Sequence, residues 1–112
     1  MNKKIGKALS IVGLPTYFIS KGVSKDKEYI LFNYLSYPAL YADNSLKGTN
    51  YTILINLYCI NNVEQYKSII LKAMIKNGFL GGNIEPTRIE NDSNGNLIYN
   101  TAITFKAFLR AD

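Results

Sequence analysis

Histidine is absent from this sequence, and cysteine occurs only once, at Cys59. Histidine is the commonest general base and a frequent zinc ligand, so its absence removes the usual basis for acid–base, nucleophilic and zinc chemistry. A single cysteine can form neither an internal disulfide nor a thiolate metal site. We therefore expect Cys59 to pack as a small apolar residue.

Acidic residues are also few, and no two of them have the spacing of a catalytic pair. Asp43 is the only acid between Glu28 and Glu64, and an isolated aspartate followed by asparagine is typical of a turn. The glycine-rich stretch at 78–82 lacks the lysine and hydroxyl residue of a phosphate-binding loop. The sequence thus predicts a protein that is not an enzyme, with no catalytic residue, no cofactor and no metal site.

Long apolar runs are missing too. No stretch approaches the roughly 20 apolar residues that a membrane-spanning helix needs. Residues 1–15 place lysines before apolar residues, but Lys7 and Ser10 interrupt the apolar run, so we expect a helix of the mature protein and not a signal peptide. Apolar residues make up 47% of the chain, which is typical of a globular protein. We expect one domain spanning residues 1–112 and no contact with a membrane.

Basic residues exceed acidic ones by five, and most of this excess lies near the N-terminus. Residues 1–35 contain six lysines and two acids, whereas the rest of the chain is nearly balanced. A basic segment can face nucleic acid, and the nine tyrosines and five phenylalanines offer surfaces for base stacking. The other interpretation is a solvated charged face on a sheet, because strands favour aromatic residues in any case.

The clearest structural signal is a strand followed by an amphipathic helix within residues 51–80. Alternate residues of the predicted strand at 51–59 are apolar and share one face. Apolar residues over 63–77 recur at helical spacing and form one stripe. The predicted core residues are Ile53, Ile55, Leu57, Tyr66, Ile70, Ala73 and Met74, together with Ile103 and Phe105 of the last strand.

The ends of this helix also carry sequence signals. Asn61 and Asn62 both suit the N-cap, with Glu64 or Gln65 three residues later to complete a capping box. Gly78 suits a left-handed C-cap.

The segments before this unit predict a short helix and two strands. The helix is expected over 3–12, and the strands over 16–20 and 29–37. Pro38 either ends the second strand or confines it to a sheet edge. Residues 39–50 are predicted to be a loop, because they contain several turn-forming residues.

The segments after the unit predict a bend and a hairpin. The two glycines at 81 and 82 indicate a bend, and Pro86 interrupts a predicted strand at 84–90. The Asn-Gly pair in 92–95 indicates a tight turn before the longest strand, at 97–109. The sequence therefore predicts an α+β domain in the order α-β-β-β-α-β-β. Its sheet is mainly antiparallel, with one helix packed across it and a short N-terminal helix.

The order and spacing of these segments resemble the tail terminator, or tail completion, proteins of long-tailed bacteriophages. Those proteins also begin with a short helix, a strand, a charged turn and an aromatic strand. They continue with a loop that contains proline and an acid. Next comes a strand that leads into a helix ending in Gly-Phe, and the last element is a hairpin. The matching stretches here are TYFIS at 16–20, YILFNY at 29–34, PALYADN at 38–44, YTILINLYC at 51–59, Gly78-Phe79 and LIYNTAITFKAF at 97–108.

The resemblance implies a structural role without catalysis. Members of this family assemble into a ring, commonly a hexamer, on the head-proximal end of the tail tube, where the ring ends tube polymerisation and docks the filled head. The implied partners are further copies of the chain, the tail tube protein and a head completion or connector protein, with DNA only as passing cargo. The implied location is the virion tail, after assembly in the bacterial cytoplasm. The alternative is a small basic nucleic-acid-binding domain or another protein-interaction domain.

Two connections are the candidate assembly contacts. Residues 21–28 and 38–50 are long for connections between strands, and edge strands and long loops are natural contact surfaces. Lysines alternate with acids in the first connection, so it can meet a charged partner without a large net field. The candidate contact residues are Lys21, Lys25, Asp26, Lys27, Glu28, Tyr41, Asp43 and Lys47.

Overall fold

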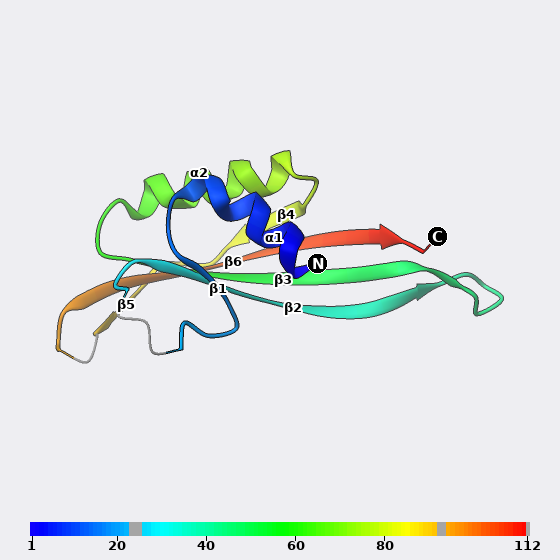
Figure 1. Cartoon of the computed structure of the whole chain (residues 1–112), viewed down its shortest axis with the longest axis horizontal. Helices are drawn as coiled ribbons and strands as arrows, with labels where there is room; N and C mark the ends of the chain where they lie inside the picture. The colour runs from blue at the N-terminus through cyan, green and yellow to red at the C-terminus, as the bar shows by residue number, and fades with distance from the viewer. Residues whose placement is uncertain (23–25, 92–93, 112) are drawn as a thin grey trace.

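The computed structural model describes residues 1–22, 26–91 and 94–111. It shows a mixed α+β domain with a six-stranded, mostly antiparallel sheet, so the predicted class is confirmed. Helices α1 (Asn2–Leu9) and α2 (Val63–Lys76) lie on the same side of the sheet (Figure 1). The remaining elements are the 3₁₀ helix η1 (Ser10–Val12), β1 (Thr16–Phe18), β2 (Tyr29–Leu40), β3 (Leu46–Cys59), β4 (Leu80–Ile84), β5 (Arg88–Asn91) and β6 (Leu97–Arg110).

The sheet is built around two long central strands. Its order is β1-β2-β3-β6-β4, and β5 pairs with another part of β6. All pairs are antiparallel except β1 with β2. Strand β1 covers only the start of β2, pairing Thr16 with Ile30 and Phe18 with Phe32. The rest of β2 is therefore a free sheet edge among the described residues.

The core lies between the helices and the sheet. On the sheet side it contains Ile53, Ile55, Leu57, Ile103 and Phe105, all fully buried, as the alternation of these residues predicts. On the helix side Ile70, Ala73 and Met74 are buried as predicted, and α1 adds Ile5 and Leu9. Tyr66 is only half-buried, contrary to the prediction, and packs at the margin of the core.

The C-terminal end of α2 forms a complete cap. Gly78 has a φ of 90°, its N–H donates to the Ile75 carbonyl at 3.1 Å, and the N–H of Phe79 donates to the Met74 carbonyl at 3.1 Å. This pair of hydrogen bonds is the Schellman arrangement, and the buried Phe79 supplies its apolar contact. The predicted left-handed C-cap is confirmed.

The predicted capping box at the N-terminal end of α2 is wrong. Asn62 occupies the N-cap with a φ of 63°, but its side chain makes no capping hydrogen bond. Instead, the carboxylate of Glu28 accepts the N–H of Ile60 at 2.9 Å and of Asn61 at 3.4 Å. A side chain from 32 residues earlier in the chain therefore holds the turn before α2.

The predicted loop at 39–50 is also wrong in most of its length. Strand β2 continues through Pro38 to Leu40, and β3 begins at Leu46, so only 41–45 connect them. Pro38 is tolerated because this part of β2 is a sheet edge, which is the second of the two predicted roles for this residue.

A strand that the sequence did not predict, β4, replaces the expected bend at residues 79–82. Leu80 pairs with Lys106 and Ile84 pairs with Ile103, with an irregularity between Gly81 and Asn83. Both glycines have positive φ, so they form a bulge within a strand and the chain does not turn back there. The strand predicted at 84–90 is accordingly divided into β4 and β5, and the order gains one strand.

The strands on either side of the predicted Asn-Gly turn pair as expected. Asn91 lies opposite Leu97 in the ladder between β5 and β6. Gly95 has the positive φ that such a turn needs. Residues 92 and 93 of the predicted turn lie outside the described residues.

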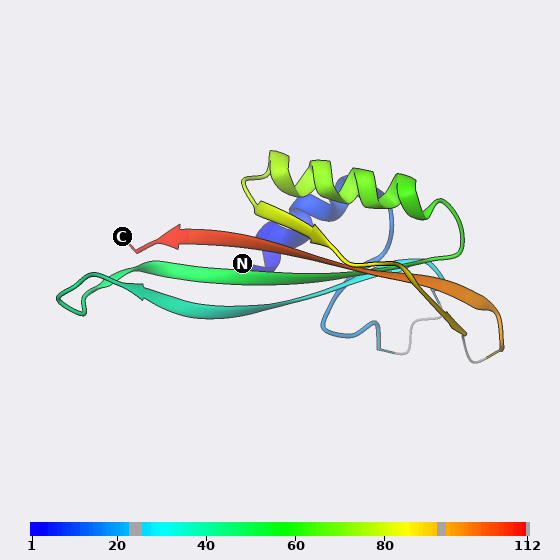
Figure 2. The same ribbon diagram turned by 180° about the vertical axis from the view of Figure 1, so that it is seen from behind.

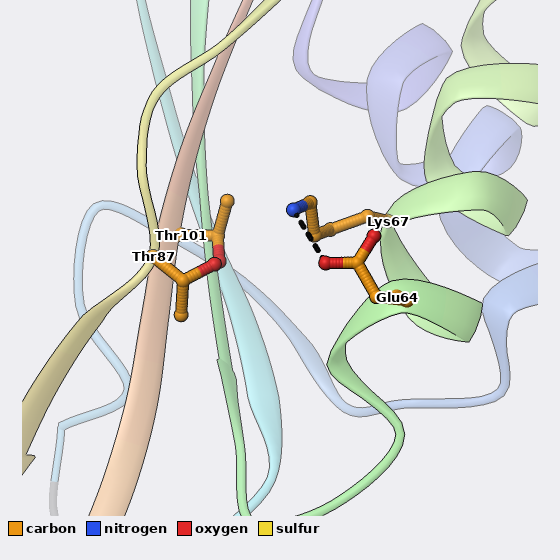
Figure 3. Close-up of polar contacts among 4 residues, drawn as sticks. All are labelled: Glu64, Lys67, Thr87 and Thr101. Carbon is orange, nitrogen blue, oxygen red and sulfur yellow. Dashed lines mark hydrogen bonds and ion pairs between the residues drawn. The ribbon is translucent and has the colours of Figure 1, made fainter.

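Two polar pairs flank the space between α2 and the sheet (Figure 3). The hydroxyl oxygens of Thr87 and Thr101 lie 2.7 Å apart, which joins the segment between β4 and β5 to the buried face of β6. On α2, the Lys67 ammonium lies 3.0 Å from the Glu64 carboxylate. Glu64 is exposed, and pairs of this kind contribute about 0–1 kcal/mol.

Cys59 is buried, as predicted, and its burial gives a test of the packing. Burial raises the pKa of the thiol from 9.0 to about 11. Because the thiolate is the reactive form, native protein at about pH 8 should resist a disulfide reagent and react rapidly only in denaturant. The protonated thiol contributes to the free energy of unfolding. This contribution is complete below the pKa of the thiol in the unfolded chain, and it is lost as the pH rises through the raised pKa of the thiol in the folded chain. Fast labelling of the native protein would contradict this packing.

Candidate assembly surfaces

The candidate contact residues fall into two groups at different places in the fold. The molecule measures 55 × 26 × 23 Å, and the hairpin of β2 and β3 extends along its longest axis (Figure 1). Tyr41, Asp43 and Lys47 lie in or beside the turn of this hairpin. The described residues of the first connection, 21–22 and 26–28, lie between β1 and β2, away from that end in both views (Figure 2). The two groups therefore belong to separate surfaces.

The first group makes contacts within its own chain. Lys21 donates from Nζ to the Asp26 carbonyl at 3.1 Å and lies 4.7 Å from the centre of the Tyr29 ring. The Tyr17 hydroxyl donates to the Asp26 carboxylate. Glu28, as described above, accepts two N–H groups at the end of β3. Substitution of Lys21, Asp26 or Glu28 therefore disturbs the fold locally, whatever their role in assembly.

Two lysines of the first group remain. Lys27 is exposed, so its charge is accessible to a partner. Lys25 lies outside the described residues.

The second group surrounds a well-ordered turn. The Ser45 hydroxyl donates to Asp43 Oδ1 at 2.6 Å, and the Ser45 N–H donates to the same oxygen at 3.0 Å. The Tyr41 N–H donates to the Ser45 carbonyl at 2.9 Å. The hydrogen bonds from Ser45, that of its hydroxyl first, lower the pKa of the Asp43 carboxyl, which is therefore ionised at neutral pH. The predicted turn role of Asp43 is confirmed.

We define the arm as residues 35–52, the end of the β2–β3 hairpin that contains its turn. The turn end of this hairpin extends beyond the helices (Figure 1). Its β3 strand pairs with the end of β6, from Thr52 opposite Lys106 to Gly48 opposite Arg110. Gly48 is buried beneath the Phe108 ring, and Lys47 Nζ lies 5.9 Å from the centre of that ring. Most of the segment predicted to be a loop therefore lies in a three-stranded projection made of β2, β3 and the end of β6.

The side of the sheet away from the helices exposes apolar side chains. Leu35, Tyr37, Leu54 and Phe108 lie on this side and are exposed. The sequence analysis did not identify this side as an apolar surface. The relevant signal is that both residue sets of β2 contain apolar residues, with Leu31, Leu35 and Tyr37 on the side away from the helices.

Seven of the fourteen aromatic residues pack against one another, all of them on β1, β2 and β3. Tyr29 and Tyr58 stack at 4.7 Å, Phe18 and Tyr34 stack at 5.5 Å, and Tyr29 also meets Lys21. Burial raises the pKa of both Tyr29 and Tyr58. These contacts use the aromatic faces for sheet packing, which was one of the two sequence interpretations.

In residues 1–22, 26–91 and 94–111, no three His, Cys, Asp or Glu residues lie together in a way that would hold a metal ion. None of the helices in these ranges has the length and apolar character to cross a membrane.

Comparison with known proteins finds similar structures but no similar sequence. No protein-family model matches this sequence, and no curated protein matches it. The fold resembles that of a virion chain. One structural neighbour is a chain from the structure of the virion of a native gene transfer agent particle, with a TM-score of 0.54 and 9% sequence identity. The likeness covers 93% of this chain and 84% of the other. At this identity it shows a shared fold.

Proposed function

We propose that this chain is a structural protein of a phage or prophage virion, and that it caps the head-proximal end of a tail tube. The observation that carries the proposal is the fold shared with a chain of a gene transfer agent virion over nearly the whole sequence. The order of segments, which resembles tail terminator proteins, supports the finer assignment to the tail. Ending tube growth and docking the head are the proposed activities, and neither needs a catalytic group.

Assembly into a ring is the second part of the proposal. A ring needs head-to-tail contacts that close by rotation, so each copy must offer two different surfaces. The arm is one suitable surface, because it projects and its β2 edge has backbone groups without strand partners among the described residues. The other surface must lie elsewhere on the domain. The proposed partners are further copies, the tail tube protein and a head completion or connector protein.

The direct experiment combines sedimentation with electron microscopy of the purified chain, alone and mixed with tail tubes. Rings of uniform size, or a cap at one end of each tube, are the expected result. A chain that leaves tube length unchanged and binds neither end would contradict the proposal.

Charge reversal in the first connection should separate folding from assembly. Lys27 is exposed, and we expect Lys25→Glu with Lys27→Glu to change the free energy of unfolding by less than about 0.5 kcal/mol. The same change should impair capping, so that phage tails vary in length or fail to join heads. Lys3→Glu with Lys7→Glu, at two exposed positions of α1, is the matched double charge control. Normal tails from the double variant would show that Lys25 and Lys27 take no part in the proposed contact.

Nucleic-acid binding remains the alternative class, and the arrangement of the lysines argues against it. Helix α1, with Lys3, Lys4 and Lys7, lies on one side of the sheet (Figure 1, Figure 2). Lys21 instead lies over the Tyr29 ring, on the side away from the helices. These four lysines thus do not line one continuous groove. A binding titration at several salt concentrations discriminates, because phosphate contacts give a steep salt dependence.

A further inference from the structure

A small apolar groove opens between η1 and α2. Ile11 lines one side, and Ile69, Lys72, Ala73 and Lys76 line the other. The four α2 residues are spaced by three, four and seven positions, so they lie on one face of the helix. The groove has a volume of about 200 Å³. Pockets for drug-sized ligands measure roughly 300–1,000 Å³, and an apolar cavity of about 150 Å³ holds benzene, so this groove fits a single large side chain.

The residues around the groove leave both apolar surface and positive charge available. Ile11 is 71% exposed, an unusual state for a large aliphatic side chain beside a helix. Lys72 and Lys76 are exposed, and over the described ranges neither makes an ion pair, since the acid of α2 pairs with Lys67. An occupant that fits this groove has an apolar side chain next to an acidic one.

The tip of the arm has this combination of groups. Leu40, Tyr41 and Leu46 are each 51–53% exposed and surround the turn at 41–45. Asp43 supplies one carboxylate, and its two hydrogen bonds from Ser45 hold the turn in one shape. Because the turn is already ordered, little conformational entropy is lost when it binds.

The tip cannot reach the groove of its own chain. The arm runs along the longest axis of the molecule and ends beyond the helices, whereas the groove lies between η1 and α2 (Figure 1, Figure 2). Contact between these two surfaces must therefore join different copies. Such a contact uses unlike surfaces, so it is head-to-tail and forms a ring when the rotation closes.

We propose that the arm tip of one copy binds the groove of a second copy, with Tyr41 in the groove and Asp43 beside Lys72 and Lys76. This proposal rests on the proposed function, for which it names the subunit contact. Charge complementarity supports this occupant, because Asp43 lies within the turn and the groove carries two ammonium groups. The other charge near the tip, Lys47, lies over the Phe108 ring, 5.9 Å from its centre. A small molecule and an unrelated protein are the competing occupants.

Site-directed crosslinking tests the contact directly. Chains with Asn44→Cys at the tip and Lys72→Cys at the groove are mixed, alone and on tail tubes, and treated with a short bismaleimide; the native Cys59 is buried and does not compete. Crosslinks are expected between a tip chain and a groove chain, and not between two tip chains or two groove chains. Lys106→Cys in place of the groove variant is the control for random collisions. Absence of the mixed crosslink under both conditions would overturn the proposal.

Charge exchange then tests the pairing of Asp43 with the lysines. Asp43→Asn keeps an oxygen that can accept the Ser45 hydrogen bonds and removes only the charge, so it should weaken association. Lys72→Glu with Lys76→Glu should weaken association about tenfold or more, because these changes place like charges together. Adding Asp43→Asn to the double glutamate chain should strengthen its association again, since the repulsion is then removed. Unchanged association in the separate variants, or no recovery in the combined chain, would contradict the pairing.

The two proposals fail in different ways. A specific tip-to-groove crosslink in a chain that does not cap tails would leave the contact standing and reject the function. Capping by a chain that gives no such crosslink would leave the function standing and reject the contact. Circular dichroism of each variant shows whether it is folded before either conclusion is drawn.

Discussion

Replacing Ile70 by alanine should lower the free energy of unfolding by about 2–5 kcal/mol, because the change removes three carbon atoms from a closely packed site. Ile70 is fully buried between α2 and the central strands, in one cluster with Ile55, Met74 and Ile103. Apolar packing holds this helix on the sheet, since its described ion pair joins two residues of the helix itself. Chemical denaturation monitored by circular dichroism measures the loss.

The matched control is Ile75→Ala on the same helix. Ile75 is 53% exposed, so the same truncation there should change the stability much less. Both substitutions favour the helix slightly through the higher propensity of alanine, which makes the difference between them a measure of packing alone. Equal effects of the two substitutions would show that this face of α2 is not the core face.

Replacing Gly48 by alanine should detach the arm from β6 and cost about 1–3 kcal/mol, as insertions into filled sites do. An added Cβ at this position would lie under 3.0 Å from the Phe108 ring and from the Leu109 carbonyl oxygen, closer than real Cβ atoms approach. The carbonyl belongs to the backbone of the paired strand, so the strain cannot be relieved by rotating a side chain. Amide hydrogen exchange should accelerate in 46–52 and 106–110.

Gly6→Ala provides the control for Gly48→Ala. Gly6 lies within α1, and an added Cβ there meets nothing within 4 Å. Alanine should therefore stabilise the protein by about 0.5–1 kcal/mol through helix propensity. If Gly48→Ala proved equally harmless, the ladder between β3 and β6 would not extend into the arm. A displaced arm should also reduce tip-to-groove crosslinking, which links the stability of the arm to the proposed assembly.

The sequence by itself determined the elements whose signals are local. The alternation of Ile53, Ile55 and Leu57 and the helical spacing of Ile70 and Met74 identified both faces of the core, because these periods follow from backbone geometry. Gly78 predicted the end of α2 because the left-handed cap needs only the residue itself. The turn role of Asp43 is similarly local, since its hydrogen bonds reach only to Ser45.

Only the tertiary structure decided the features that depend on residues distant in sequence. Glu28 caps the turn before α2 from 32 positions away, so the local capping box at Asn62 is not needed and does not form. The arm exists as strands because β6 pairs with residues that are locally turn-like, and Pro38 is accepted because β1 leaves that edge of β2 uncovered. The groove is formed by η1 and α2, which are separated by three strands in sequence, and therefore no local pattern indicated it. Each of these features depends on a pairing between distant segments, and such pairing is set by the packing of the whole sheet.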